Sequence, residues 1–296
     1  MVSILIPVFN HKITSLVHDL CKQIEENSID AEIIIVDDAS LINFEENVKV
    51  SDLKYVRYER LQNNIGRSKI RNYLASLAKF DYLIFIDCDA GIVDESFINN
   101  YIDCIKKERE VACGGLLYEK KKPQNHKLFF RWYYGVKREC RELHDRIKNP
   151  YKSFSSFNFL IKKETLENIN FNEDISTYGH EDTLLGIELK KQNVDIYHID
   201  NPLLHDGLED TLQFIHKTNQ SIENLKYLVK NYSELYPLAE SIKLIKYVHY
   251  AKKIGVTRIF RLIYKIAGKM FVKNLMSKYP SLYIFDLYKI CYYFSL

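Results

Sequence analysis

The first 90 residues alternate between short apolar runs, which are typical of buried β-strands, and segments with the apolar spacing of helices. Strands are expected at Val2–Val8, Glu32–Val36, Leu53–Tyr58 and Tyr82–Ile86, and helices at His11–Glu26 and about Ile65–Ala78, with Asn64 as a cap. Strand and helix in alternation predict right-handed βαβ units and a mainly parallel sheet. The alternation therefore places the chain in the α/β class. Further strands are expected at Val111–Tyr118, Ser153–Ile161 and Asp195–Ile199.

Polar residues follow three of these strands at the point where each one ends. Asn10 follows the first strand, and Asp37 and Asp38 follow the second. Asp87 and Asp89 follow the fourth, in the run Tyr82–Asp89. Ligands of an open parallel sheet bind outside the carboxyl ends of its strands, so these side chains should converge on one crevice. Carboxylates there suit Mg²⁺ or Mn²⁺ bound to substrate phosphates, which predicts an enzyme acting on a nucleotide diphosphate. Solvated turn aspartates are the alternative.

A basic helix start lies near this crevice. Arg67 and Arg71 are four residues apart in Asn64–Asn72 and share one helix face. Guanidinium groups suit bidentate contact with phosphate oxygens, so one or both are candidates for a phosphate contact. A solvated basic face is the alternative interpretation.

Taken in order, these motifs resemble a family 2 glycosyltransferase of the GT-A fold. The matching segments, spread over about residues 2–206, are VSILIPVFN, IIIVDDAS, NIGRSKIRN, YLIFIDCDA as the DxD motif, and GHEDT. The resemblance implies a Rossmann-like, mainly parallel central sheet flanked by helices in residues 1–207, and a basic helical C-terminal region in residues 208–296. It also implies sugar transfer from a nucleotide-diphosphate donor, expected to be a UDP-sugar, to a hydroxyl of a glycan or lipid-linked acceptor, in surface polysaccharide or glycan assembly.

The resemblance assigns nucleotide contacts residue by residue. Pro7, Phe9 and Asn10 would flank the nucleoside, while Asp38, with Asp37, would bond to the uracil or ribose. The complete implied nucleotide-binding set is Pro7, Phe9, Asn10, Asp37, Asp38, Asn64, Arg67, Arg71 and Asp87.

A divalent cation, Mn²⁺ or Mg²⁺, is the implied cofactor. Asp89 would bind the ion directly, and Asp87 would contact the ribose or a metal-bound water. His205 occupies the place where related enzymes often carry a third metal ligand, and imidazole is compatible with Mn²⁺. A histidine hydrogen-bonded within a loop is the alternative.

GHEDT is similar to the acidic helix start of chondroitin-polymerase and β-1,4-galactosyltransferase-type enzymes. By that resemblance Asp182 is the catalytic base, and Glu181 positions the acceptor or the sugar. An inverting transfer needs one base in line with the acceptor hydroxyl, opposite the leaving diphosphate. Two acids at a helix start also follow from ordinary charge preference, which is the competing explanation.

The end of the chain is strongly basic. Residues 241–296 contain eleven Lys or Arg and one acid, Asp286, whereas the rest contains 31 basic and 38 acidic residues. The apolar positions with helical spacing are Ile242, Ile245, Val248, Ile254, Ile259, Leu262, Ile263, Ile266 and Met270. Basic amphipathic helices lie at the surface of anionic membranes, so residues 240–296 are predicted to dock there. A helical appendage packed on the first domain is the alternative, and no motif indicates nucleic-acid binding.

The sequence also bears on the location of the protein in the cell and on alternative functions. The six cysteines are scattered without metal-binding spacing, which favours a reducing compartment. With neither a signal peptide nor a membrane span recognised, we expect a cytoplasmic protein, peripheral on the inner face of the plasma membrane. The rivals are a nucleotidyltransferase acting on a sugar phosphate and an inactive membrane-associated scaffold of the same fold. The first normally has a glycine-rich phosphate loop, which residues 7–12 lack.

Overall fold

The computed structural model describes residues 1–175, 178–232 and 237–296, and the chain divides into two compact units. Unit 1 comprises Met1–Glu119, Cys140–Ser176 and Glu181–Gly207; unit 2 comprises Lys120–Glu139, Thr177–His180 and Leu208–Leu296. Lys120–Glu139 thus group with the C-terminal helices, although they lie within the range that the sequence assigns to the first domain.

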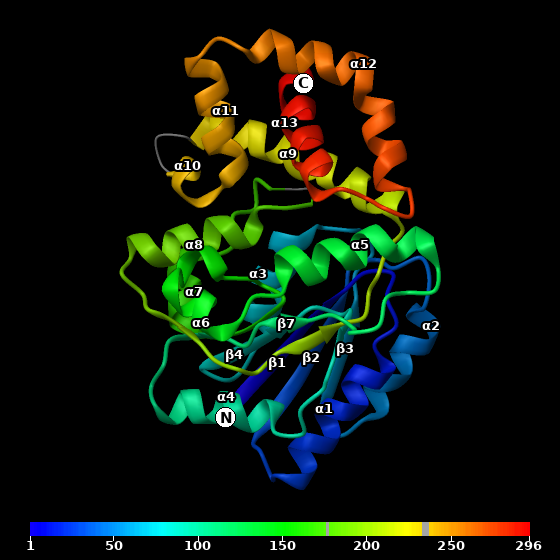
Figure 1. The fold of residues 1–296 in the computed structure, drawn as a ribbon. Helices are drawn as coiled ribbons and strands as arrows, with labels where there is room; N and C mark the ends of the chain where they lie inside the picture. The colour runs from blue at the N-terminus through cyan, green and yellow to red at the C-terminus, as the bar shows by residue number, and fades with distance from the viewer. Residues whose placement is uncertain (176–177, 233–236) are drawn as a thin grey trace. The chain divides into compact units, whose positions relative to one another are not determined.

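A seven-stranded sheet forms the centre of unit 1 (Figure 1). In the order β3-β2-β1-β4-β8-β6-β9, its strands are β3 Val56–Arg60, β2 Ala31–Asp37, β1 Val2–Val8, β4 Tyr82–Ile86, β8 Asn158–Lys162, β6 Val111–Cys113 and β9 Ile196–His198. The pairs β1–β2, β1–β4, β2–β3 and β6–β9 are parallel, whereas β8 is antiparallel to both β4 and β6. The predicted mainly parallel sheet is therefore confirmed.

A second, three-stranded sheet lies in unit 1. Its strands, in order, are β5 Ala90–Gly91, β10 Leu203–His205 and β7 Leu116–Leu117. The expected single strand Val111–Tyr118 is therefore two strands, β6 and β7, which belong to different sheets. The break falls at Gly114 and Gly115, and Gly115 has a φ of +93°, which favours glycine.

Helices cover both faces of the central sheet because its strands are apolar on both faces. The helices of unit 1 are α1 Thr14–Glu26, α2 Phe44–Asn47, α3 Arg67–Leu77, α4 Phe97–Lys106, α6 Leu143–Lys148, α7 Lys163–Ile169 and α8 Glu181–Lys191, with 3-10 turns η1 Val48–Asp52 and η4 Tyr151–Ser153. Alternate residues of β1 face opposite ways: Ile4 packs with α1 and α4, and Leu5 packs with α3, α7 and α8. Burial of both faces is typical of a mainly parallel sheet.

Unit 2 is helical and has its own core. Its elements are the 3-10 turn η2 His126–Leu128, the π-helical segment η3 Gly135–Glu139, and the helices α5 Phe129–Tyr134, α9 Thr211–Tyr232, α10 Leu238–Ser241, α11 Lys243–Lys253, α12 Thr257–Leu275 and α13 Leu282–Ser295. Phe130, Phe214, Leu275, Phe285 and Tyr288 form one buried cluster that joins α5, α9, α12 and α13. Within the described ranges no helix is both long and apolar enough to span a membrane.

Candidate active site

The carboxyl ends of β2, β1 and β4 lie at one edge of the central sheet, because these strands are parallel neighbours. Just past β1, the Phe9 side chain is exposed, and Pro7 is partly exposed. Asn10 has a left-handed φ of 54°, and its Oδ1 accepts a hydrogen bond from the Leu41 amide at 2.7 Å. This contact fixes the loop that carries the three residues predicted to flank the nucleoside.

Asp37 is fully enclosed at the end of β2. Its exposed fraction is 0%, and its carboxylate accepts hydrogen bonds from the Ser40 amide and the Tyr58 hydroxyl, both at 2.7 Å. Burial, followed by the hydrogen bond to Asp37, raises the pKa of Tyr58 well above its usual range, so the phenol stays a donor. In this structure Asp37 offers no surface to a nucleotide and stabilises the loop after β2.

Asp38 fixes the start of α3. Its carboxylate accepts the amides of Ile65 and Gly66 at 2.7 and 3.1 Å, while burial raises its pKa against the effect of these bonds. The predicted cap at Asn64 is wrong: α3 begins at Arg67, with Gly66 in the cap position at φ 86°. Asn64 instead donates its side-chain amide to the Asp38 carbonyl at 3.1 Å. Asp38 thereby sets the helix that carries both arginines.

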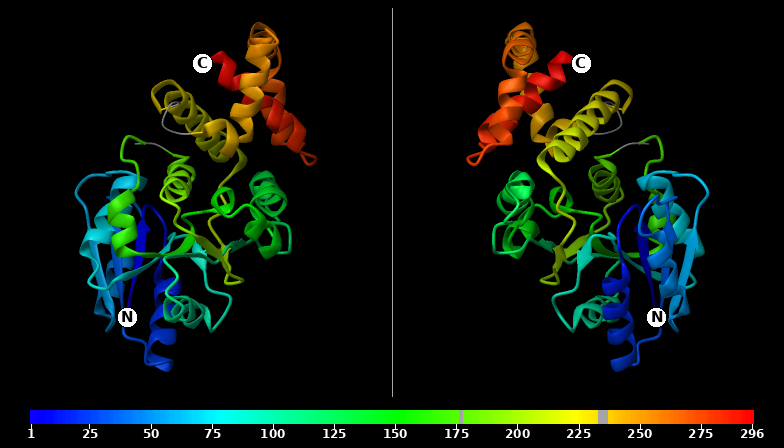
Figure 2. Two further views of the ribbon diagram at one scale, coloured as in Figure 1. Left: turned by 90° about the vertical axis from the view of Figure 1, so that its left-hand side faces the viewer. Right: turned by 90° about the vertical axis from the view of Figure 1, so that its right-hand side faces the viewer.

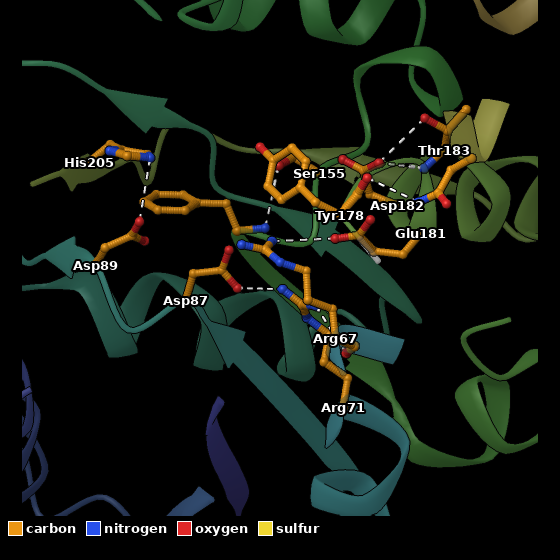
Figure 3. Close-up of polar contacts among 12 residues, drawn as sticks. Arg67, Arg71, Asp87, Asp89, Ser155, Tyr178, Glu181, Asp182, Thr183 and His205 are labelled. Carbon is orange, nitrogen blue, oxygen red and sulfur yellow. Dashed lines mark hydrogen bonds and ion pairs between the residues drawn. The ribbon is translucent and has the colours of Figure 1, made fainter. Parts of the chain in front are cut away.

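A continuous set of polar contacts connects the end of β4 with the start of α8 (Figure 3). Arg71 Nη2 donates to Asp87 Oδ1 at 2.6 Å, and Arg71 Nη1 donates to the Arg67 carbonyl at 3.2 Å. Arg67 Nη1 lies 3.4 Å from Glu181 Oε1. Because the Arg71 side chain is almost fully buried, its ion pair with Asp87 is weakly screened. The two arginines therefore hold the DxD segment and the acidic start of α8 in one region of unit 1.

The start of α8 presents two acids with different environments. Glu181 is buried; Oε1 faces Arg67, while Oε2 accepts no hydrogen bond from any residue that the structure describes. Asp182 keeps some exposed surface, and its Oδ1 accepts the Thr183 amide at 2.7 Å. Burial, and then the charge of Glu181, raises the pKa of Asp182 to about 6. A carboxylate with this pKa is ionised at neutral pH and is a stronger base than an ordinary aspartate.

Asp89 and His205 lie side by side (Figure 3), with His205 Nε2 at 3.6 Å from Asp89 Oδ2. The second sheet sets this approach, since β5 and β10 are antiparallel and pair His205 with Ala90. The Asp206 amide also donates to the Asp89 carbonyl at 2.8 Å. At Gly207 a Cβ would lie 2.6 Å from Asp89 Oδ2, so only glycine leaves this carboxylate its position.

Two aromatic rings enclose the imidazole of His205. The Tyr118 ring stacks on the imidazole at a centroid distance of 5.0 Å and an interplanar angle of 17°. The Phe157 ring stacks on the same imidazole at a centroid distance of 5.5 Å and an interplanar angle of 14°. The Phe157 carbonyl also accepts the Asp87 amide at 3.0 Å. Phe157 therefore orients His205 through its ring and fixes the DxD segment through its backbone.

Asp89 and His205 suit a hard or borderline divalent cation. One carboxylate and one imidazole, with the remaining positions taken by phosphate oxygens and water, match the usual donors of Mg²⁺ or Mn²⁺. Asp87, the third predicted ligand, has its Oδ1 on Arg71. Across residues 1–175, 178–232 and 237–296, no group of three or more His, Cys, Asp or Glu side chains is arranged to hold an ion. An ion here would thus depend on oxygens of the substrate.

A comparison with known protein families identifies the class of enzyme to which this site belongs. The model for glycosyl transferase family 2 matches residues 3–169, more than half of the chain. The chain belongs to this family. It is a glycosyltransferase, and the matched range includes the strand ends, both arginines and the DxD segment of the site described above.

Solved structures share the fold of this family 2 member. The mannosyltransferase PcManGT from Pyrobaculum calidifontis, in complex with GDP-Man and Mn²⁺, has a TM-score of 0.58 at 13% identity, over 99% of this chain and 84% of that one. S. aureus TarS 1–349 with UDP-GlcNAc has a TM-score of 0.52 at 17% identity, over 99% and 89%. The match to a longer S. aureus TarS structure (19% identity, TM-score 0.52) covers 78% of this chain but only 44% of that chain. No curated protein matches. These likenesses confirm the predicted GT-A fold.

Three residues of the site escaped the sequence analysis: Tyr118, Phe157 and Gly207. The two rings come from segments far apart in the chain, and neither lies in a recognisable motif. Gly207 follows His205 by two residues, and a glycine so close to a candidate ligand was the one available signal. Glycine is required at position 207 because of the nearby Asp89 side chain. Asp89 is distant in sequence, so the spacing of residues alone does not reveal this requirement.

The Phe157→Leu substitution is expected to weaken Mn²⁺ binding about ten-fold, because it removes one of the rings that orient His205. Phe154→Leu is the matched control, since Phe154 is equally buried but packs on Phe159. Electron paramagnetic resonance of Mn²⁺ titrated in the presence of UDP measures the affinity. Equal Mn²⁺ affinities in the two variants would contradict an orienting role for this ring.

Proposed function

We propose that this glycosyltransferase is a divalent-metal-dependent, inverting enzyme that transfers a sugar from a UDP-sugar to a hydroxyl of a glycan or lipid-linked acceptor. The observation that carries the proposal is the contact series Asp87–Arg71–Arg67–Glu181, because it holds the Asp89–His205 pair and Asp182 in one region of unit 1. Nucleotide-sugar complexes of the fold relatives support a donor of this class.

The proposed reaction replaces one bond to the anomeric carbon with another. Asp182 takes the proton of the acceptor hydroxyl as its oxygen attacks the anomeric carbon, and the bond from that carbon to the diphosphate breaks to release UDP. Glu181, whose buried Oε2 has no hydrogen-bond partner among the residues that the structure describes, would hold an acceptor or sugar hydroxyl. Pro7, Phe9 and Asn10 would flank the nucleoside at the end of β1.

The diphosphate needs neutralisation as it leaves. Asp89 and His205 would hold the cation, which as a Lewis acid would stabilise charge on the diphosphate. Arg67, which is partly exposed next to Glu181, is the proposed phosphate contact of α3. Arg71 is almost fully buried on Asp87, so its part is to position that carboxylate rather than to meet the nucleotide directly. A cytoplasmic location, peripheral on the membrane that holds a lipid-linked acceptor, belongs to the same proposal.

A nucleotide-release screen tests the proposal. Purified protein is incubated with common UDP-sugars and with GDP-mannose, with and without Mn²⁺, and release of UDP or GDP is measured. Release with a UDP-sugar that requires Mn²⁺ is the expected result. Pyrophosphate release from UTP and a sugar 1-phosphate would assign the site to a nucleotidyltransferase instead. Absence of both release and nucleotide binding with every donor would favour the inactive scaffold.

A further inference from the structure

The outward face of α12 exposes a stripe of large apolar side chains. Ile259, Leu262, Ile266 and Met270 are 55%, 56%, 69% and 68% exposed. Spacings of three and four residues place them on one side of the helix. Surface helices normally show polar residues on the side away from the core, so packing within unit 2 does not account for this stripe.

The opposite face of α12 already packs against α13 (Figure 2). Phe260 stacks on Phe294 at a centroid distance of 5.7 Å, and Tyr264 contacts Tyr292 at 5.5 Å. Leu275, near the end of the helix, is buried in the core of unit 2. The orientation of α12 is therefore set by a well-packed inner face, and the outer stripe is a second apolar surface.

The sequence predicted one apolar face over the C-terminal helices, and the structure divides it into two surfaces. Ile245 and Val248 of α11 are fully buried, so they serve the interior of the unit. Ile259, Ile266 and Met270 of α12 remain exposed. Other exposed apolar side chains of unit 2, such as Ile254, lie outside α12, but on α12 four of them follow one another along a single side of the helix.

Basic side chains border this stripe. Arg258, Lys265 and Lys269 are exposed, and each lies three or four residues from Leu262 or Ile266 on the helix surface. None of these three forms an ion pair with a residue that the structure describes. Between Ser241 and Lys278 the sequence has no acid that could neutralise them. The face combines apolar area with an uncompensated positive charge.

We propose that the exposed α12 face docks the enzyme on an anionic phospholipid membrane. Ile259, Leu262, Ile266 and Met270 would enter the boundary of the acyl chains, while the bordering cations meet lipid phosphates. A second copy would bring like charges together, and a nucleic acid would use the charge but not the apolar stripe. The docking surface extends the proposed function by giving access to a lipid-linked acceptor, yet it depends on unit 2 alone.

Vesicle sedimentation of the full chain tests the docking surface. With vesicles of equimolar phosphatidylcholine and phosphatidylglycerol the protein is expected to pellet, and with phosphatidylcholine alone it is expected to stay in solution. Combining Ile266→Ser with Met270→Ser should lower the partition coefficient about ten-fold. Combining Lys265→Gln with Lys269→Gln should lower it about thirty-fold, since each basic residue near an anionic surface contributes roughly a five-fold change.

Matched controls come from exposed positions of unit 1. Val93→Ser and Lys106→Gln change the same kinds of exposed side chain and should leave vesicle binding unchanged. Wild-type protein that stays in solution with the anionic vesicles, or controls that lose binding as much as the α12 variants, would overturn the proposal. So would a solution dimer that Ile266→Ser with Met270→Ser converts to a monomer. UDP binding, measured without vesicles, reports separately on the proposed function.

Discussion

Replacing Asp182 with Asn is expected to lower kcat about 1,000-fold, which is within the usual contribution of a positioned general base. The amide has no lone pair basic enough to take the acceptor proton. Its carbonyl oxygen still accepts the Thr183 amide, which lies 2.7 Å from Oδ1 in the wild type, so the start of α8 should keep its geometry. UDP affinity is expected to stay within about two-fold, because the role proposed for Asp182 lies in proton transfer and not in nucleotide binding.

The control for this variant is Glu181→Gln, which keeps the shape of the neighbouring side chain. It removes the ion pair with Arg67 and the acceptor contact proposed for Oε2, so it should raise the KM of the acceptor more than it lowers kcat. Steady-state kinetics with a donor found by the release screen, and UDP binding by calorimetry, separate the two variants. Turnover of Asp182→Asn at the wild-type rate would show that another group is the base.

The raised pKa of Asp182 makes the same assignment visible in a pH profile. The carboxylate must be ionised to act as a base, so kcat/KM should rise with pH through about 6. Because the charge of Glu181 is one cause of the raised pKa, Glu181→Gln should move this rising limb to lower pH. A limb that Glu181→Gln leaves in place would assign the titration to another group.

The free energy of unfolding should change with pH in the opposite sense to kcat/KM. A carboxyl whose pKa is higher in the folded than in the unfolded state binds more protons when folded. The free energy of unfolding therefore falls as pH rises through about 6. Asp182→Asn removes that dependence, so its melting temperature should decline less than that of the wild type between acidic and neutral pH.

The sequence was sufficient to predict those parts of the site that depend on local patterns of residues. Apolar runs located β1, β2 and β4, and parallel topology then placed Asn10, Asp38 and Asp89 at one edge. The acids of GHEDT at the start of α8 were likewise readable, since a helix start with two carboxylates is a local feature. These features needed no knowledge of which residues meet in space.

Long-range contacts decided what the sequence could not show. Two adjacent aspartates at the end of β2 looked equivalent, but Asp37 accepts the Tyr58 hydroxyl while Asp38 accepts the Ile65 amide just before α3. The start of α3 itself depends on that contact, which explains the error at Asn64. The antiparallel strand β8 lies between β4 and β6. Phe157, the residue just before β8, stacks its ring on His205. Such pairings depend on the whole fold and leave no periodic signal.

Replacing Asp89 with Asn is expected to weaken Mn²⁺ binding at least ten-fold and to lower kcat about 100-fold or more, since a bound ion contributes several kcal/mol to stabilising the leaving diphosphate. The substitution removes the negative charge that lies 3.6 Å from His205 Nε2. Asp103→Asn is the charge-matched control, because Asp103 is an exposed residue of α4 paired only with Lys106 among its described ion-pair partners. Mn²⁺ affinity with UDP present, by electron paramagnetic resonance, is the direct measurement.

A comparison with Asp87→Asn separates the two carboxylates of the DxD segment. Asp87 neutralises the buried Arg71 at 2.6 Å, so its loss leaves a buried charge unpaired and should lower the melting temperature by about 5 °C. Asp89 has no such arginine partner in the part of the chain that the structure describes, and Asp89→Asn should melt within about 1 °C of the wild type. Mn²⁺ affinity should fall further in the Asp89 variant than in the Asp87 variant. If Mn²⁺ affinity falls equally in both, the two aspartates share the ion, and the ion pair with Arg71 must open when the donor binds.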